Sequence, residues 1–223
     1  MNSPATKFSP PVYLDHVLLV VNKPAGLPVL PDGWQPDAPY LLDLLQQEYG
    51  RLWVVHRLDK STSGVMLFAR TAEAHRILNL QFDQHEVEKV YHAIVTGTPA
   101  WDEQICRLPL RVNVGHRHRT VVDEGRGKIS ETRFHILKRG QAAALVEARP
   151  KTGRTHQIRA HLSALGFPLL GDFLYGAPIS PSLNRPALHA VSLAILHPDS
   201  KQRLVFSAAY PPDFEAAIAL LGF

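Results

Sequence analysis

The sequence contains a single cysteine, Cys106, among 223 residues. One cysteine excludes an intramolecular disulfide framework and is typical of proteins from a reducing compartment. The histidines are scattered, and only His116 and His118 are closely spaced, so no tetrahedral set of metal ligands can be recognised. We therefore expect a cytoplasmic protein with neither a metal site nor another bound cofactor.

Long apolar runs are also missing. The uninterrupted Val and Leu run over residues 17–21 is far shorter than the ~20 residues that are needed to cross a bilayer. Residues 1–11 contain three prolines but no apolar segment of the kind found in secretory signals. We expect these eleven residues to form a flexible tail, and we expect no membrane partner.

The composition is that of an ordinary globular protein, with 45% hydrophobic and 20% charged residues. A chain of 24.8 kDa buries roughly 70% of its unfolded surface, which is enough for a full core. Internal repeats, low-complexity tracts and long linkers are absent from the sequence. We therefore expect residues 12–223 to form a single domain, and a monomer is the default oligomeric state.

Positive charge is only mildly in excess, with a formal net charge of +4, but it is unevenly distributed. Residues 107–128 contain six cations and two histidines, opposed there only by Asp123 and Glu124. The cations and histidines are Arg107, Arg111, His116, Arg117, His118, Arg119, Arg126 and Lys128. This segment is expected to be a basic loop that faces phosphate groups, with a solvated surface loop as the alternative.

Short apolar runs rich in Val, Ile and Leu predict strands through most of the chain. The expected strands are residues 53–55, 65–69, 90–95, 129–137, 142–148, 187–196 and 204–208, with a hairpin turn over 138–141. Without a regular alternation of strands and helices, this order predicts an α+β fold with a mixed sheet.

Helices are expected where apolar residues recur at intervals of three and four. Thr71 is a candidate N-cap for a helix that buries Ala74, Ile77, Leu78 and Phe82. Shorter helices are expected around Leu41, Leu44 and Leu45, over residues 155–165 with Gly166 as C-terminal cap, and from Asp213 through Phe214, Ile218 and Leu221.

Between two of the expected strands lies the polar loop His56–Gly64, which contains Asp59. An Asp followed by Ser, Thr and Gly is also what an ordinary turn contains, and the loop alone favours that interpretation. Two further polar segments, 89–97 and 151–162, break the apolar pattern in the same way. Three such segments in one chain indicate a functional site, because reactive groups are commonly held at strand ends.

These segments, together with residues 19–27 and 165–172, resemble in order and spacing the motifs of the RluA-type pseudouridine synthases. The resemblance covers about residues 12–210. It implies an isomerase that converts a uridine to pseudouridine in structured RNA, ribosomal or transfer or both. It also implies an extended mixed, mainly antiparallel sheet with flanking helices and a central catalytic cleft. Many members carry an N-terminal RNA-binding domain of the S4 type, for which this chain has no room.

Isomerisation breaks the bond from N1 to C1′, turns the uracil and joins C5 to the same sugar carbon. Asp59 is the candidate catalytic carboxylate, as a nucleophile or as the partner of a cationic sugar. A nearby cation is expected to keep it ionised. Arg159, about 100° from the buried stripe of its helix, is our first candidate, and Arg154 is the second. For both arginines the alternative is a phosphate contact or a surface cation.

The resemblance gives roles to further residues. It places Tyr91 against the target base, where it stacks and passes a proton at C5, although the pattern alone favours a core aromatic. Leu188 corresponds to an apolar residue beneath the uracil, and Arg57 to an arginine near the space that the flipped base leaves. We expect His56 and His156 to hold backbone groups around the two loops that bind the RNA.

Arg117 and Arg119 are the candidate RNA contacts of the basic loop. A non-catalytic RNA-binding or ribosome-assembly protein on the same fold is the main alternative function. A hydrolase that attacks a glycosidic bond with Asp59 is a weaker one, since no motif supplies a second carboxylate beside it.

Overall fold

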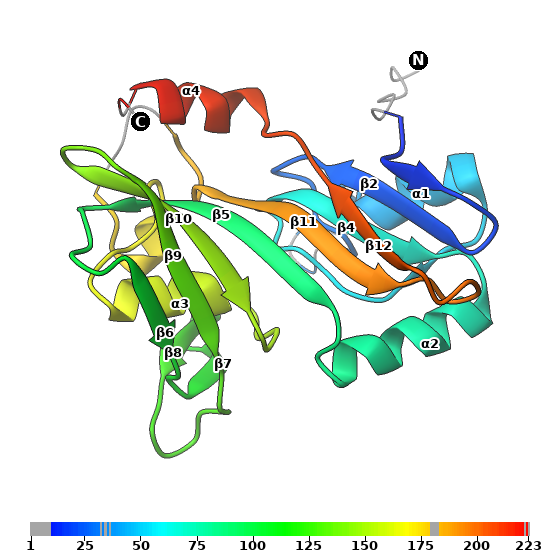
Figure 1. The fold of residues 1–223 in the computed structure, drawn as a ribbon, viewed down its shortest axis with the longest axis horizontal. Coiled ribbons are helices and arrows are strands. Elements are labelled where there is room, and N and C mark those ends of the chain that lie inside the picture. The colour runs from blue at the N-terminus through cyan, green and yellow to red at the C-terminus, as the bar shows by residue number, and fades with distance from the viewer. Residues whose placement is uncertain are drawn as a thin grey trace.

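A mainly antiparallel sheet of ten strands forms the body of the protein (Figure 1). The computed structural model describes residues 10–31, 33, 35, 37–178, 183–220 and 222. The strand order is β1-β2-β4-β11-β5-β10-β9-β6, with β12 paired to β11 and β3 paired to β4. Among the described pairings only β4 and β11 are parallel. The expected α+β class with an extended mixed sheet is confirmed.

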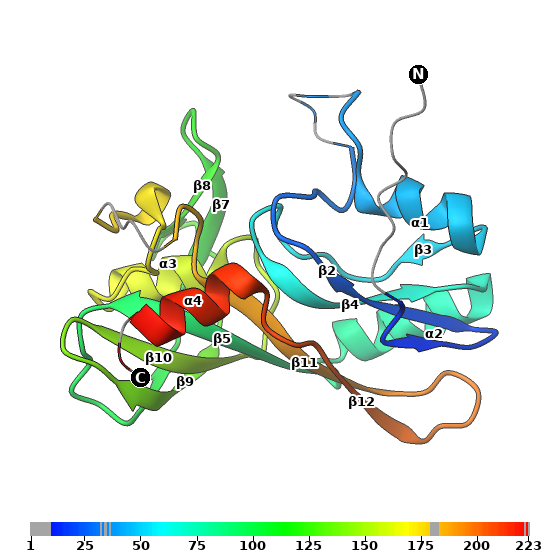
Figure 2. The same cartoon turned by 90° about the horizontal axis from the view of Figure 1, so that it is seen from above.

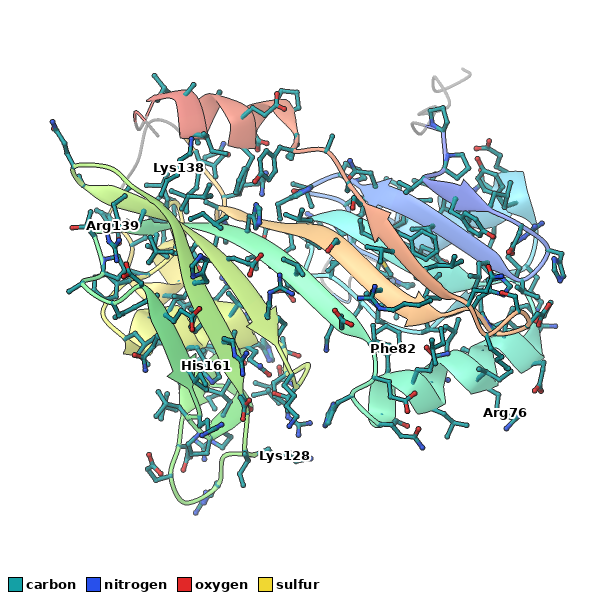
Figure 3. The ribbon with its side chains drawn as sticks, in the orientation of Figure 1. Arg76, Phe82, Lys128, Lys138, Arg139 and His161 are labelled. Atoms are coloured by element: carbon teal, nitrogen blue, oxygen red, sulfur yellow. The ribbon has the colours of Figure 1, made fainter. Side chains whose placement is uncertain are left out.

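The strands of this sheet have the following bounds: β1 Tyr13–Leu14, β2 Leu18–Lys23, β3 Trp53–Val54, β4 Ser63–Ala69, β5 Glu88–Thr96, β6 Glu103–Cys106, β9 Thr132–Arg139, β10 Ala143–Pro150, β11 Leu188–Leu196 and β12 Arg203–Ser207. The seven expected strands are all present, with ends shifted by up to three residues. Lys138 and Arg139 mark the turn end of the β9–β10 hairpin (Figure 3).

The expected basic loop is partly a hairpin, which corrects our prediction. β7 (Leu110–Val114) and β8 (Arg119–Val122) form a separate two-stranded sheet. Arg117 lies in the turn, and Arg119 begins β8. Figure 2 shows this hairpin standing out from the main sheet.

Within the described residues, four α-helices and one short 3₁₀ helix flank the sheet: α1 Leu41–Tyr49, α2 Ala72–Asp83, α3 Gln157–Ala164, η1 Phe173–Tyr175 and α4 Pro212–Leu220. Thr71 caps α2 as expected, since its Oγ1 accepts the N–H of Ala74 at 3.1 Å. Gly166 ends the α3 segment at a φ of +88°. None of the helices in the described part of the chain is long and apolar enough to span a membrane.

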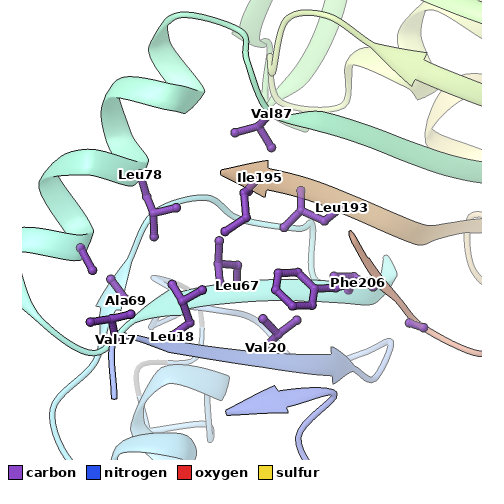
Figure 4. Close-up of a cluster of buried hydrophobic side chains, with 13 residues drawn as sticks. Val17, Leu18, Val20, Leu67, Ala69, Leu78, Val87, Leu193, Ile195 and Phe206 are labelled. Atoms are coloured by element: carbon purple, nitrogen blue, oxygen red, sulfur yellow. The ribbon is translucent and has the colours of Figure 1, made fainter. Parts of the chain in front are cut away.

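The hydrophobic core consists of separate clusters on the two faces of the sheet. On one face, α2 packs over β2, β4 and β11 through side chains such as Leu78, Leu67 and Leu193 (Figure 4). On the other face, α1 and α3 cover the two halves of the sheet, and Tyr91 contacts both of their clusters. The loop that contains Asp59 lies at the boundary between these two clusters.

Two sequence predictions fall partly outside the described residues. The expected tail, 1–11, is described only at residues 10 and 11. α4 contains Phe214 and Ile218 as expected, while Leu221 lies outside the described residues.

Candidate active site

Asp59 lies in the loop between β3 and β4, and neighbouring segments hold the backbone of that loop. The N–H of Thr62 donates to the carbonyl of Asp59 at 3.0 Å. The carbonyl of Lys60 accepts the N–H of Gly26 at 2.8 Å and the Nζ of Lys23 at 3.2 Å. The loop is therefore fixed to the segment that follows β2, and Asp59 has a defined position.

Lys23 is fully buried, and its ammonium group is used for this attachment. Besides Lys60, Nζ donates to the carbonyls of Pro24 and Leu27, each at 2.8 Å. Burial lowers the pKa of Lys23 to about 7, while the negative charge of Asp59 acts in the opposite direction. Three carbonyl acceptors satisfy the three donors of a charged ammonium, so the protonated lysine fits this site.

The far side of the loop is held by the C-terminal part of the chain. Arg185 donates to the carbonyl of Ser61 at 3.2 Å and forms a two-bond ion pair with Asp213 at 2.7 and 2.9 Å. The hydroxyl of Ser63 bonds to the buried ring of His189 at 2.9 Å. The contacts at Ser61 and at Ser63 each link residues more than 100 positions apart in the chain.

Two groups face the Asp59 carboxylate, whose side chain is 22% exposed. Nη1 of Arg159 lies 3.8 Å and Nε2 of His156 lies 3.7 Å from Oδ2 of Asp59. Arg154 is exposed and makes no side-chain hydrogen bond or ion pair with the described residues. Of the two candidate cations, Arg159 is thus the one beside Asp59.

Arg159 has a closer partner that the sequence reasoning missed. Its guanidinium donates to both carboxylate oxygens of Asp172, at 2.7 and 2.8 Å, and the two side chains are 6% and 1% exposed. Burial acts to lower the pKa of Arg159, but the hydrogen bonds and charge of Asp172, with that of Asp59, outweigh it and raise the pKa. Arg159 is therefore a fixed cation shared by two carboxylates.

His156 caps the N-terminus of α3 in a left-handed conformation, with φ of 54°. Residues other than glycine adopt this region at a cost, and such strain is often found at functional sites. Burial lowers the pKa of His156, against the opposing effect of Asp59, so the ring is neutral at pH 7. Its Nδ1 lies 3.2 Å from the hydroxyl of Tyr175.

Tyr175, another residue missed from the sequence, joins the site to the β7–β8 hairpin. Its hydroxyl accepts the backbone N–H of Thr120 in β8 at 2.9 Å. The guanidinium carbons of Arg119 and Arg159 lie 5.3 and 4.9 Å from the centre of its ring. Arg119 thus packs on an aromatic ring beside the site, whereas Arg117 is exposed at the hairpin turn.

A cavity opens above Asp59. The predicted residues that line it are Arg57, Asp59, Tyr91, Arg154, His156, Arg159 and Leu188, and Thr62, Lys89, Gln157 and Ile158 are among the others. Burial, and then the charge of Asp59, raises the pKa of Tyr91, so its phenol is protonated at neutral pH. Leu188 is 4% exposed and forms an apolar part of the wall.

His56 does not line this cavity. Its Nε2 accepts the N–H of Leu67 in β4 at 3.0 Å, and its ring stacks on Phe82 with 5.0 Å between centres. Burial and the charge of Lys89 lower its pKa to about 3. The expectation that His56 holds a backbone group agrees with this geometry, but the group belongs to a strand and not to an RNA-binding loop.

Metal ligands are not gathered at the site. Among the residues that the structure describes, no group of three or more His, Cys, Asp or Glu side chains is arranged to hold a metal ion. The polar groups around Asp59 are instead two nitrogen donors and a phenol.

The site thus combines a carboxylate in a loop of the sheet, an arginine beside that carboxylate and a tyrosine in the wall of the same cavity. The family model described as RNA pseudouridylate synthase matches residues 17–164, and the chain belongs to this family, whose members are isomerases.

The dual-specificity RNA pseudouridine synthase RluA of Salmonella typhi is 38% identical over 205 residues, covering 91% of this chain and 93% of that protein. The ribosomal large subunit pseudouridine synthase D of Zymomonas mobilis is 37% identical over 94% of this chain and 72% of its own length. The solved structure of human RNA pseudouridylate synthase domain containing 4 superposes with a TM-score of 0.78 at 26% identity, covering 95% of this chain and 92% of that one.

Proposed function

We propose that this chain isomerises a specific uridine to pseudouridine in structured RNA, ribosomal or transfer, with Asp59 as the catalytic carboxylate. The observation that carries the proposal is the placement of Asp59 beside Arg159, at 3.8 Å, in a cavity that a protonated Tyr91 also lines. The names of the relatives support ribosomal RNA as one substrate class, through the large-subunit enzyme, and more than one target RNA, through the dual-specificity enzyme.

Asp59 acts on the sugar or the base once the target nucleotide has left its stack and entered the cavity. An ionised carboxylate adds to an electrophilic carbon or stabilises positive charge on the sugar as the glycosidic bond breaks. Arg159 favours the ionised form, and because Asp172 holds the guanidinium in two bonds, its position does not depend on Asp59. Proximity and fixed charge therefore supply most of the catalysis.

Tyr91 and Leu188 hold the uracil while it is detached from the sugar. After C5 has joined the sugar, C5 must lose its proton and N1 must gain one. The phenol is protonated at neutral pH, so it takes the C5 proton only by passing its own proton on, as a relay between C5 and N1, while its ring stacks on the base. Leu188 gives the base an apolar surface on which it turns. Arg57, exposed at the rim, offsets part of the unstacking cost by stacking on the neighbouring bases.

A glycosidase mechanism is disfavoured by the state of the second carboxylate. The second carboxylate near Asp59 is Asp172, which is bound to Arg159; the sequence did not indicate this carboxylate. Both of its oxygens are engaged by that arginine, and it is 1% exposed. It is therefore not placed to protonate a leaving group, as hydrolysis would require. A purely RNA-binding role does not explain why Arg159 is held beside the carboxylate of Asp59.

The test is a pseudouridine map of total RNA from cells that lack the gene and from the same cells restored with wild-type or Asp59→Asn protein. We expect one position, or a small set, to lose pseudouridine and to regain it only with the wild type. A map that is unchanged by loss of the gene would refute the proposal and favour the RNA-binding alternative.

A further inference from the structure

A second hollow adjoins the active-site cavity at Lys89 and Pro150, which line both. Its other walls come from the loop between α2 and β5 and from the ends of β9 and β10. Besides Lys89 and Pro150, the lining residues are His85, Val87, Glu88, Glu131, Arg133, Arg149 and Lys151. We call this hollow the cationic groove.

The two carboxylates of the groove are already neutralised by arginines outside it. Glu131 pairs with Arg107 at 2.8 Å, and Glu88 pairs with Arg203 at 2.8 Å. The hydrogen bond from Arg107 is the main cause of the lowered pKa of Glu131, with smaller contributions from the charges of Lys151 and Arg133. Few acceptors are left for the cations that line the groove.

Three of the cations that line the groove have no ion-pair partner among the described residues. Arg149 pairs with Glu147 at 2.7 Å, on the same strand. Lys89, Arg133 and Lys151 make no ion pair within 4 Å with the described residues. Arg57 and Arg154, both exposed, line the active-site cavity, so cations line both hollows and Lys89 is common to the two.

The sheet register adds an independent observation. Arg133 in β9 stands directly opposite Arg149 in β10. Like charges in directly opposed positions destabilise a sheet. Arg149 is already paired with Glu147, so Arg133 is the member of this opposed pair that lacks an ion-pair partner among the described residues and is left for an anionic ligand.

We propose that the cationic groove binds the sugar–phosphate backbone of the RNA strand next to the target nucleotide. A nucleotide whose base occupies the cavity brings its flanking phosphates to the rim, and Lys89 is the cation common to both hollows. The strand therefore runs past Lys89 toward Lys151 and Arg133. This inference rests on the proposed RNA isomerase function and specifies how its substrate is held.

The test removes Arg133 and Lys151 together, because neither lines the active-site cavity. Binding of a fluorescein-labelled uridine oligomer of about 20 nucleotides is measured by anisotropy over a range of salt concentrations. For Arg133→Ala/Lys151→Ala we expect Kd to rise about tenfold near 0.1 M salt. We also expect the slope of log Kd against log salt to fall by about 1.4, since each lost single-strand phosphate contact removes about 0.7.

The matched control is Arg76→Ala/Lys138→Ala, which also removes one arginine and one lysine from the exposed surface. Arg76 lies on α2 and Lys138 at the β9–β10 turn, both away from the groove (Figure 3). The control should bind as the wild type does. If the groove variant has the same Kd and salt slope as the control, the proposal is overturned.

Pseudouridine formation is followed in parallel with total RNA from cells that lack the gene. At saturating enzyme the groove variant should react as fast as the wild type, because it keeps Asp59, Tyr91 and Arg159. It should also unfold at the same temperature or higher, since the opposed arginine pair is relieved. If the wild type binds RNA through the groove but forms no pseudouridine, the proposed function is refuted while the proposed role of the groove in RNA binding is supported.

Discussion

Asp172 shows how the reactivity of one side chain depends on another that never touches the substrate. Its carboxylate holds Arg159 in two hydrogen bonds at a buried position, and Arg159 in turn faces Asp59. The motif Leu170–Gly171–Asp172 was visible in the sequence. Its role was not, because the pairing of residues 13 apart depends on how η1 packs against α3.

Removal of Asp172 should destabilise the protein strongly. Asp172→Ala leaves a buried guanidinium without its partner, which costs about 3–5 kcal/mol in the free energy of unfolding. Chemical denaturation measures this change. Arg76→Ala, which breaks the exposed pair with Glu73, is the matched control and should change the unfolding free energy by less than about 1 kcal/mol. Equal effects of the two substitutions would show that Arg159 finds another partner.

His56 should make the free energy of unfolding depend on pH in the acidic range. Its folded pKa of about 3 lies below the unfolded value of 6.5, so the folded protein binds fewer protons between these values. Stability is therefore fully present above about pH 6.5 and is lost as the pH falls toward 3. In His56→Gln, whose amide oxygen still accepts the N–H of Leu67, the free energy of unfolding should fall less steeply between pH 6.5 and 4.

The control for this titration is His116→Gln, at the exposed turn of the β7–β8 hairpin. Its unfolding free energy should follow the wild type at every pH. If the His56→Gln profile runs parallel to the wild-type profile, His56 is not the neutral buried group that the geometry indicates.

At the scale of elements, the parallel contact between β4 and β11 positions the catalytic loop. Gly64 has a φ of +119° and stands opposite Ala190, and a Cβ there would lie 2.2 Å from the carbonyl oxygen of Ala190. Gly64→Ala should lower the free energy of unfolding by about 2 kcal/mol or more.

Gly33→Ala is the control for that substitution, because a Cβ at this position meets nothing within 4 Å. Its unfolding free energy should stay within about 0.5 kcal/mol of the wild type. A Gly64→Ala protein as stable as Gly33→Ala would mean that the parallel pair can shift at little cost.

The elements also show where sequence reasoning succeeds. The α2 boundary was predictable because Thr71 and the periodic apolar residues are local signals. The β7–β8 hairpin was missed although Leu110, Val112 and Val114 alternate with polar residues, because the density of charge favoured a loop. Its partners Thr120 and Tyr175 are 55 residues apart, and no local pattern records such a contact.

For the whole molecule, one sheet runs through both halves, and the active site lies where the clusters covered by α1 and α3 meet. We therefore expect residues 12–223 to unfold as a single cooperative unit. Trp53 packs with the α2 cluster and Trp101 with the α3 cluster, so each tryptophan reports on one half. Fluorescence of the Trp34→Phe/Trp53→Phe and Trp34→Phe/Trp101→Phe proteins, each of which keeps one tryptophan, is followed against denaturant with far-UV circular dichroism and should give coincident transitions. Separate midpoints would show two folding units.

The central claim is that Asp59 performs the chemistry and that other residues bind the RNA. The most direct measurement is the single-turnover rate of pseudouridine formation by Asp59→Asn on the mapped RNA, with the affinity for that RNA measured on the same preparation. We predict that the rate becomes undetectable while Kd stays within a few fold of the wild type, because phosphate contacts carry most of the binding. Turnover at the wild-type rate would contradict the assignment of Asp59.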